Sequence, residues 1–353
     1  MTRFGTASRR EYARPLQPVV DSAGWEPEDI RSIDAWAYRF SPGDLDEIAA
    51  AIAAVRRKEI PIVAMTAADF PLPRLAPVIA DARHELLDGR GFVYLRGLPV
   101  GDMTQEEVAI AYFGIGHYLG RPVSQNAEGH LLGHVKDYGG RSIDDLNTRG
   151  YQTTAELGFH ADHCDYVGLL CLRTAKSGGA SRFASSVTLH NRLLAQRPDL
   201  VEVLCRDFHY SRAGEVPPGK EPWYMQPVFS FHEGFFSARG VSSYIFKAQK
   251  IPGVPPFTPA QQEAVALFRK TVAECAVDLE FQPGDIQLLH NHVVLHSRSA
   301  YEDWPDPARK RHLLRLWLRD SKGRPLPPSV RENFIGVEVA GFMPKVPLDV
   351  AVA

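Results

Sequence analysis

The chain has 353 residues, of which 44% are hydrophobic and 23% are charged, as in an ordinary globular protein. Its 40 Lys and Arg residues against 42 Asp and Glu residues give a formal net charge of -2, and no block of basic residues occurs. This balance argues against binding to nucleic acids or anionic membranes, which needs a basic surplus, and no apolar run reaches the roughly 18–20 residues of a membrane span.

The cysteines give no sign of a metal ribbon or a redox pair. Cys164, Cys171, Cys205 and Cys275 form no CxxC motif. Four cysteines in so long a chain are typical of buried thiols in a reducing compartment. Residues 1–15 are Arg-rich, but no apolar stretch follows them, so they do not form a secretory signal. We therefore expect a cytoplasmic protein.

Residues 1–89 predict an N-terminal helical extension. Ser41 is a good N-cap, because Pro42 follows at the first helical position and Asp44 lies in the first turn. The next apolar residues share one helical face: Leu45, Ile48, Ile52 and Val55. A second helix is expected over residues 74–88, and we expect the extension to pack on the core.

A strand and a helix follow the extension. Residues 91–99, GFVYLRGLP, predict a strand that a glycine and a proline end. Thr104 with Glu107 forms a capping box and opens a helix. Its apolar face contains Val108, Ala111, Tyr112, Ile115 and Leu119. At the helix end, GIGHYLG (114–120) resembles a dinucleotide-binding loop only superficially, because it does not join a strand to a helix.

Beyond residue 120 the pattern changes to short strands and loops. The expected elements are a buried strand over 166–172, a hairpin over 227–238, a helix from Thr258, two strands divided near Asn291 and a last strand over 311–319. Because strands and helices do not alternate regularly, an antiparallel sandwich with helical decoration fits better than a doubly wound sheet. The Pro-rich tail from Ser321 is expected to wrap the surface.

The first chemical signal is the pair His160 and Asp162 in the segment ELGFHADHCDY. Residues i and i+2 of a strand point to the same side, so an imidazole and a carboxylate can occupy neighbouring positions on one metal. A bare HxD is more often a surface histidine near an aspartate. His163 and Cys164 suggest zinc only weakly, because adjacent strand residues point to opposite sides.

A second cluster, LLHNHVVLHSR (288–298), contains His290, His292 and His296. A third ligand from this strand would complete a facial triad of two histidines and one carboxylate, the ligand set of non-haem Fe(II) oxygenases. Three ligands on one octahedral face leave the opposite face open. A 2-oxo acid can then chelate the metal through two positions, and O2 can take the third.

With these motifs the sequence resembles the taurine / 2,4-dichlorophenoxyacetate dioxygenase family of Fe(II)- and 2-oxoglutarate-dependent oxygenases. Four pieces occur in the family's order: GFVYLRG, the HAD motif at 160–162, KSGGASRFAS (176–185), and PGDIQLLHNHVVLHSR with RHLLRLWL within 283–318. The resemblance covers roughly residues 90–320. It implies a mainly β fold with α decoration, a double-stranded β-helix or jelly roll, with a tail over 321–353 and with the metal on the inner face of the larger sheet.

The resemblance implies that the metal is Fe(II), held by His160, Asp162 and His296. In the family the distal histidine lies five residues after an asparagine, and Asn291 plus five gives His296. His290 and His292 remain alternatives. Asp162 argues against halogenation, because halogenating relatives replace this carboxylate with a small residue.

The resemblance also implies that 2-oxoglutarate binds through Arg311, which lies fifteen residues after His296, together with the Ser181 hydroxyl. Strand alternation places Arg311, Leu313, Arg315 and Trp317 on one face. Ser181 is also readable as a plain turn residue. Loss of affinity in an Arg311 variant is expected, and an unchanged affinity would move the role to Arg315 or Arg298.

Arg315 matches the position that binds the anionic group of the substrate in the taurine enzyme. This suggests a small acidic substrate, such as a carboxylate, a sulfonate or an amino acid, although Arg315 can instead join Arg311 on 2-oxoglutarate. Tyr151 and Phe159, with Tyr166 and Trp223, are candidates for the substrate pocket, or else simply core residues. The loops 136–158 and 211–226 are expected to set specificity.

The expected reaction is oxidation of a substrate C–H bond, most simply hydroxylation, with O2 converting 2-oxoglutarate to succinate and CO2. The competing interpretations are a zinc or manganese isomerase or hydrolase on a jelly roll, which uses no 2-oxo acid, and a binding module that has kept the fold. The pairing of Arg311 with Ser181 argues against the first, and the three intact ligand positions argue against the second. The sequence indicates no oligomeric state.

Overall fold

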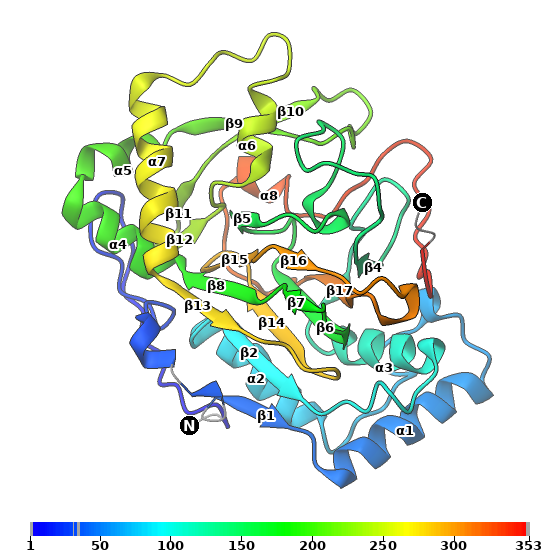
Figure 1. Ribbon diagram of the computed structural model, residues 1–353. Coiled ribbons are helices and arrows are strands. Elements are labelled where there is room, and N and C mark those ends of the chain that lie inside the picture. Colours follow the sequence, from blue (N-terminus) through cyan, green and yellow to red (C-terminus); the bar gives the residue numbers. More distant parts are fainter. Residues whose placement is uncertain (1–2, 31, 34–35, 351–353) are drawn as a thin grey trace.

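Two facing β-sheets form the centre of the molecule (Figure 1). The computed structural model describes residues 3–30, 32–33 and 36–350. The larger sheet has the order β1 (Ala37–Arg39), β2 (Phe92–Arg96), β14 (Ile286–His290), β6 (Tyr166–Arg173), β17 (His312–Arg319) and β3 (Arg121–Pro122), and β4 (Leu132–Val135) also pairs with β17. The smaller sheet has the order β13 (Ala276–Leu279), β8 (Ser181–Ser185), β15 (Val294–Arg298) and β5 (Leu157–His160). The predicted jelly roll with helical decoration is confirmed.

Three two-stranded ribbons extend this core. They are β9 (Asp207–Ser211) with β10 (Trp223–Pro227), β11 (Phe229–His232) with β12 (Phe235–Ala238), and β7 (Ser177–Gly178) with β16 (Tyr301–Glu302). The β11–β12 pair is the hairpin that the sequence predicts over 227–238.

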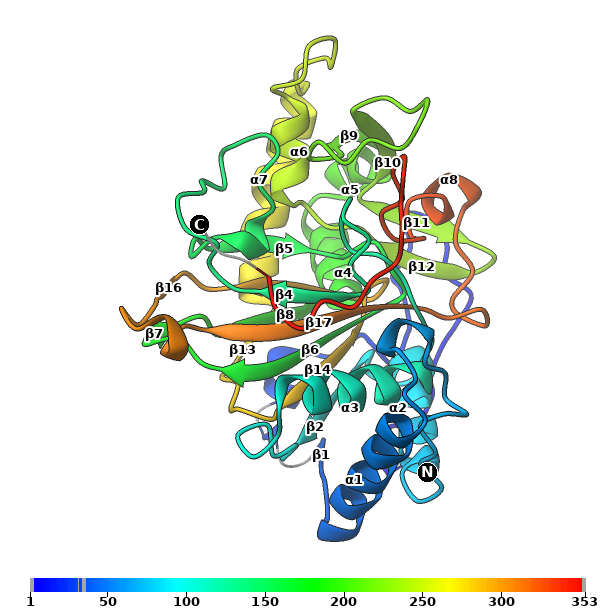
Figure 2. The ribbon, with the colours of Figure 1, turned by 90° about the vertical axis from the view of Figure 1, so that its right-hand side faces the viewer.

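Helices cover the outer face of the larger sheet (Figure 2). They are α1 (Pro42–Arg57), α2 (Ala76–Asp88) and α3 (Gln105–His117). The predicted N-cap at Ser41 and the predicted capping box at Thr104 both form, and Ser41 also makes a capping box with Asp44. The extension is not helical alone, because β1 adds a parallel strand to β2.

A second group of helices lies at the other side of the molecule (Figure 2). It contains α4 (Ser186–Gln196), α5 (Pro198–Leu204) and α7 (Pro259–Glu274), which pack on one another, and α4 also contacts β8. Two short helices are α6 (Ser243–Ala248) and α8 (Pro328–Arg331). Single 3-10 turns are η1 (Pro27–Ile30), η3 (Ile62–Ala64), η4 (Gly150–Gln152) and η5 (Pro307–Arg309).

The side chains of the last strand, β17, alternate between the two faces of the larger sheet, as the sequence pattern predicts. Leu314, Leu316 and Leu318 pack with the N-terminal helices, whereas Leu313 and Trp317 belong to the core between the sheets. The inner face of β17 therefore points toward the smaller sheet.

Strand register sets the position of the candidate site. On the smaller sheet, His296 of β15 pairs directly with His160 of β5. The expectation that the larger sheet carries the metal is therefore wrong. The larger sheet instead supplies side chains that face the metal ligands, because the inner face of β17 points toward the smaller sheet.

The four cysteines are free thiols, and Cys164, Cys171 and Cys275 are buried. Among the helices described, none combines the length and the apolar character that crossing a bilayer requires.

Candidate metal centre and its cavities

His160, Asp162 and His296 converge at the edge of the smaller sheet. His160 Nε2 lies 3.8 Å from Asp162 Oδ1, and His296 Nε2 lies 3.7 Å from Asp162 Oδ2. One ligand atom from each residue lies within 4.8 Å of the other two. Two imidazole nitrogens and one carboxylate are a fitting donor set for Fe(II).

The protonation states of the three side chains suit a cation. The His160 Nδ1–H group donates to the Gly158 carbonyl at 2.8 Å, which leaves the Nε2 lone pair free. Burial lowers the pKa of His160 and lowers that of His296 to about 3. Burial alone would raise the pKa of Asp162, but the charge of Arg315 and the hydrogen bond from Trp317 help to hold it below its ordinary value. At neutral pH the group therefore offers two neutral imidazoles and one carboxylate.

The larger sheet fixes the orientation of Asp162. Trp317 Nε1–H donates to Asp162 Oδ2 at 2.8 Å, and Arg315 Nη1 lies 3.4 Å from the same oxygen. Gln125 holds Arg315 in turn, since its Oε1 accepts from Arg315 Nε at 2.7 Å. Such outer contacts orient metal ligands and tune their basicity.

Asn291 connects the two halves of the motif. Its side-chain Oδ1 accepts from the Asp162 backbone N–H at 3.2 Å, and its Nδ2 donates to the Cys164 carbonyl at 3.0 Å. This amide ties the turn before β15 to the loop after β5. It gives a physical reason for an asparagine five residues before the distal ligand.

The competing ligands lie elsewhere. His292 Nε2 bonds Asp165 at 2.8 Å, and His290 stacks beside Tyr166 in the core. Cys164 is fully buried and donates to the Tyr166 carbonyl, while His163 stacks on Trp317, so neither joins His160.

A second group of possible metal ligands contains His134, His312 and Asp349. There, His134 Nδ1 lies 2.8 Å from His312 Nε2, and His134 Nε2 donates to the Pro347 carbonyl at 3.0 Å. Arg173 Nη2 lies 3.3 Å from His312 Nδ1 as a donor. Because a hydrogen bond already occupies each of these ring nitrogens, this group is a chain of hydrogen bonds that fastens the C-terminal segment.

The residues expected to bind 2-oxoglutarate, Ser181 and Arg311, lie at the start of β8 and directly before β17. Ser181 is buried and donates to Gln287 Oε1 at 2.7 Å. Arg311 is also buried, and its guanidinium contacts the Gly179 carbonyl at 3.4 Å. Arg298 of β15 pairs in register with Ser181.

Two adjoining cavities lie beside the metal centre. The smaller, about 40 Å³, is lined by His160, Asp162, Tyr151 and Arg315 among others. The larger is about 350 Å³. Arg149 and Tyr244 line both, so these two side chains lie between the wide cavity and the small cavity beside the metal ligands.

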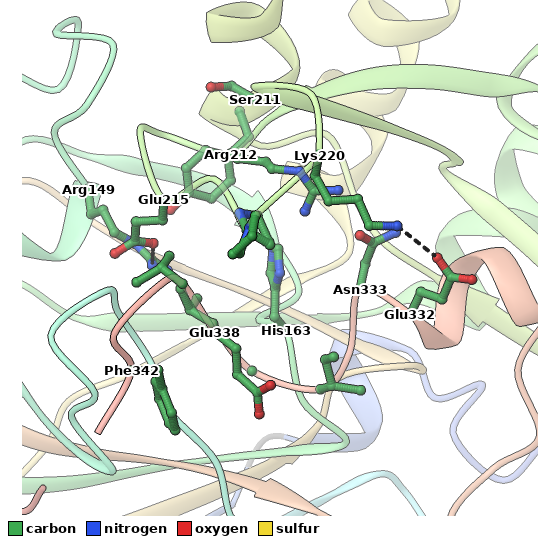
Figure 3. Close-up of a pocket in the computed structure, with 17 residues that line it drawn as sticks. Arg149, His163, Ser211, Arg212, Glu215, Lys220, Glu332, Asn333, Glu338 and Phe342 are labelled. Carbon is green, nitrogen blue, oxygen red and sulfur yellow. Dashed lines mark hydrogen bonds and ion pairs between the residues drawn. The ribbon is translucent and has the colours of Figure 1, made fainter. Parts of the chain in front are cut away.

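Loops and the tail form the wall of the larger cavity. Figure 3 shows His163 in its centre, with Arg149 and Glu215 on one side and Arg212 and Lys220 on the other. Lining residues from the tail include Glu332, Asn333, Val337, Glu338 and Phe342. Both loops that the sequence analysis names, 136–158 and 211–226, contribute, whereas the tail was expected only to wrap the surface.

Comparison with known proteins decides the family. Residues 57–317 match the model of the taurine catabolism dioxygenase TauD, TfdA family. The chain belongs to this family. A relative from Streptomyces rubellomurinus, FR-33289 synthase, is 31% identical over 92% of this chain and 97% of its own length. The taurine hydroxylase-like protein SAT17 of Stachybotrys chartarum is 28% identical over 92% and 86%.

Solved structures of oxygenases have a fold similar to that of this chain. An asparagine oxygenase in complex with Fe(II), 3-hydroxyasparagine and succinate superposes with a TM-score of 0.64, at 19% identity over 86% of this chain and 99% of that one. The oxygenase OrfP with Fe and alpha-ketoglutaric acid gives 0.60, at 15% identity over 85% and 100%. The predicted family and enzyme class, a 2-oxoglutarate-dependent non-haem iron dioxygenase, are confirmed.

Within this TauD/TfdA chain, the structure places Tyr151 and Phe159, both predicted to line the substrate pocket, in different surroundings. Tyr151 lines the smaller cavity, and its ring lies 4.7 Å from the Arg315 guanidinium. Phe159 lines neither cavity: because it precedes His160 on β5, its ring points the other way and lies under Arg182. The prediction for Phe159 is therefore not supported.

Sequence reasoning missed Gln125, Arg149, Arg239 and Tyr244. Arg239 is buried, its backbone carbonyl accepts from the Ala161 N–H, and its Nη2 donates to the Tyr224 hydroxyl. None of these residues lies in a recognisable motif. Only Arg149 lies in a loop, 136–158, that was expected to set specificity, whereas Gln125, Arg239 and Tyr244 lie outside both such loops.

Proposed function

We propose that this chain hydroxylates a C–H bond of a small organic acid. The balanced reaction consumes the substrate, O2 and 2-oxoglutarate, and yields the hydroxylated substrate, succinate and CO2. The observation that carries the proposal is the convergence of His160, Asp162 and His296 beside two neighbouring cavities. Fe(II) with 2-oxoglutarate and O2 supplies the oxidising chemistry when bound.

The chain's own residues hold and orient the reactants. His160 and His296 present Nε2 lone pairs, and Asp162 presents a carboxylate that Trp317 and Arg315 keep in place. Arg311 binds the distal carboxylate of 2-oxoglutarate, and the Ser181 hydroxyl, at the start of β8, is a second partner for it. The small cavity then holds the reacting carbon, and the wide cavity holds the rest of the substrate.

The charges around the wide cavity support an acidic substrate. Arg149 pairs with Glu215, and Lys220 lies 3.9 Å from Glu332. Within the described part of the chain, no carboxylate forms an ion pair with Arg212. An anionic group on the substrate would give this guanidinium its partner.

The printed descriptions of the similar structures support a substrate of amino-acid size. The asparagine oxygenase holds 3-hydroxyasparagine, and OrfP holds 3-hydroxyarginine. A cavity of about 350 Å³ accommodates molecules of this size.

The decisive test uses the wild-type protein without O2. Adding Fe(II), ascorbate and 2-oxoglutarate should produce the weak visible charge-transfer band of a 2-oxo acid chelated to iron. A succinate-release screen over small carboxylates, sulfonates and amino acids then identifies the substrate. If neither the band nor succinate forms, the oxygenase proposal fails and a zinc or manganese enzyme without a 2-oxo acid becomes the better interpretation.

A further inference from the structure

The co-substrate end of the fold contains two buried guanidinium groups. Arg298 and Arg311 are each only 4% exposed. Both lie against the ring of Tyr301, with their Cζ atoms 4.7 and 5.1 Å from its centroid. Among the residues that the structure describes, no carboxylate forms an ion pair with either guanidinium. Burying two like charges without a counter-ion is costly.

The hydrogen bonds of the two arginines are incomplete. Arg298 Nη2 donates to the backbone carbonyls of Thr153 and Ala155, but its Nε and Nη1 have no partner. Arg311 Nη2 reaches the Gly179 carbonyl at 3.4 Å, but its Nη1 has no partner. Three buried nitrogens that carry N–H groups are thus left unsatisfied, which is rare in folded proteins.

The surrounding backbone keeps the two side chains together. Arg298 pairs in register with Ser181 across β15 and β8. Two residues before Ser181, Gly179 has a φ of +74°, and a Cβ there would lie 3.0 Å from Arg311 Nε. Side chains from β15 and β17 therefore meet at one short segment, 179–181, where a glycine makes room for Arg311.

We propose that Arg298 is a second binding residue for the distal carboxylate of 2-oxoglutarate, acting together with Arg311. This inference rests on the proposed function. A carboxylate has two oxygens and about four acceptor sites, which suits the free nitrogens of the two guanidiniums. Its negative charge also relieves their mutual repulsion. A pair of arginines selects 2-oxo acids that carry a second carboxylate over those that lack one.

The test compares two 2-oxo acids in Arg298→Gln. With Fe(II) and without O2, the charge-transfer band reports binding of 2-oxoglutarate, and equally of pyruvate, which chelates iron but has no distal carboxylate. Arg298→Gln should raise the Kd of 2-oxoglutarate about tenfold or more and leave that of pyruvate unchanged. Iron binding, measured by metal analysis after dialysis, should stay the same.

Two further variants keep the test decisive. Arg182→Gln makes the same change on the neighbouring strand β8, where Arg182 pairs with Asp278 on the outside, and it should change neither Kd. Arg298→Lys keeps the charge, so it should give an intermediate Kd even if the glutamine variant does not fold.

The inference is overturned if Arg298→Gln leaves 2-oxoglutarate binding intact, or if it weakens pyruvate binding equally, which would indicate a merely structural role through Thr153 and Ala155. These results would leave the proposed function standing. A wild-type protein that shows no band with either acid would instead overturn the proposed function, and this inference with it.

Discussion

The metal end and the substrate end of this molecule are built in different ways. His160 and His296 come from adjacent strands whose register places them directly opposite each other. The wall of the wide cavity comes from the loops 136–158 and 211–226 and from the C-terminal tail. Strands hold the two imidazoles of the metal centre, while loops and the tail hold the wall of the cavity, where substrate specificity is set.

The two ends also differ in how their polar groups are partnered. Around Asp162, hydrogen bonds from Trp317 and Arg315 to its carboxylate, and from its backbone N–H to Asn291, leave little freedom. Around the wide cavity, the Arg212 side chain makes, among the described residues, only a bond from Nε to the Glu221 carbonyl and a contact with the Tyr224 ring. Breaking the metal end should therefore abolish activity, whereas breaking the substrate end should change selectivity.

The largest effect is expected from His296→Ala. Without this imidazole the metal keeps two ligands, so both the charge-transfer band and succinate release should fall by at least about 100-fold. The measurements are the anaerobic spectrum and a succinate assay. His232→Ala, which removes a half-buried imidazole on β11, is the control and should behave as wild type. A band that survives in His296→Ala would return the ligand role to His290 or His292.

Trp317→Phe should produce the next largest effect. The substitution keeps a ring beside His163 but removes the N–H donor to Asp162 Oδ2. Loss of such a supporting bond typically lowers metal affinity by about 10–100-fold. Titration with Fe(II), followed through the band at saturating 2-oxoglutarate, measures it. Trp304→Phe, on the loop beside Arg309, should leave iron affinity unaltered.

This difference between the ends also explains how much of the fold and of the candidate site could be predicted from the sequence. The N-cap at Ser41, the capping box at Thr104, the alternation of β17 and the HxD spacing are local patterns, and each forms as expected. The family resemblance pointed to the distal ligand His296. None of these patterns tells which sheet a strand joins, and this is why the metal was assigned to the wrong sheet.

The cavity could not be predicted because its contacts are distant in the chain. Arg149 meets Glu215 across 66 residues, and Phe342 joins them from the tail. Phe159 shows a different source of error. Its position next to His160 in the sequence suggested that it lines the substrate pocket, but adjacent strand residues point to opposite sides, so its ring points away from the pocket. Loop residues have no periodicity from which their direction can be read.

Arg212→Gln tests the substrate end. For the acid that the succinate screen identifies, KM should rise about tenfold with kcat nearly unchanged, because an anion would lose one partly buried charge-assisted bond. The Kd of 2-oxoglutarate should not change. Arg206→Gln, on an exposed side chain paired with Glu202, is the matched control. An equal fall in kcat for every substrate would place Arg212 in the catalytic step rather than in specificity.

The smallest expected effect is that of low pH on the stability of the fold, through the chain of hydrogen bonds at His134 and His312. Burial lowers the pKa of both histidines, that of His312 to about 3, so both are neutral in the fold. Below pH 6.5 the unfolded chain binds protons that the folded chain does not, so the free energy of unfolding falls as pH falls. Each histidine contributes at most about 1.4 kcal/mol per pH unit.

Thermal unfolding is measured between pH 8 and 5 for the wild type and the variants. Comparing their pH dependence of Tm separates the contribution of His312 from that of other buried histidines. His312→Gln removes one proton-binding group and should give a shallower dependence of Tm on pH than wild type, whereas His84→Gln, on an exposed part of α2, should give the same dependence. Because acid favours states in which the two histidines are exposed and protonated, it should also favour release of the tail, whose Pro347 carbonyl accepts from His134 Nε2, and so increase proteolysis there. If the tail is cut equally at pH 8 and pH 5, the histidines do not fasten it, and the substrate end is held by Arg149 and Glu215 instead.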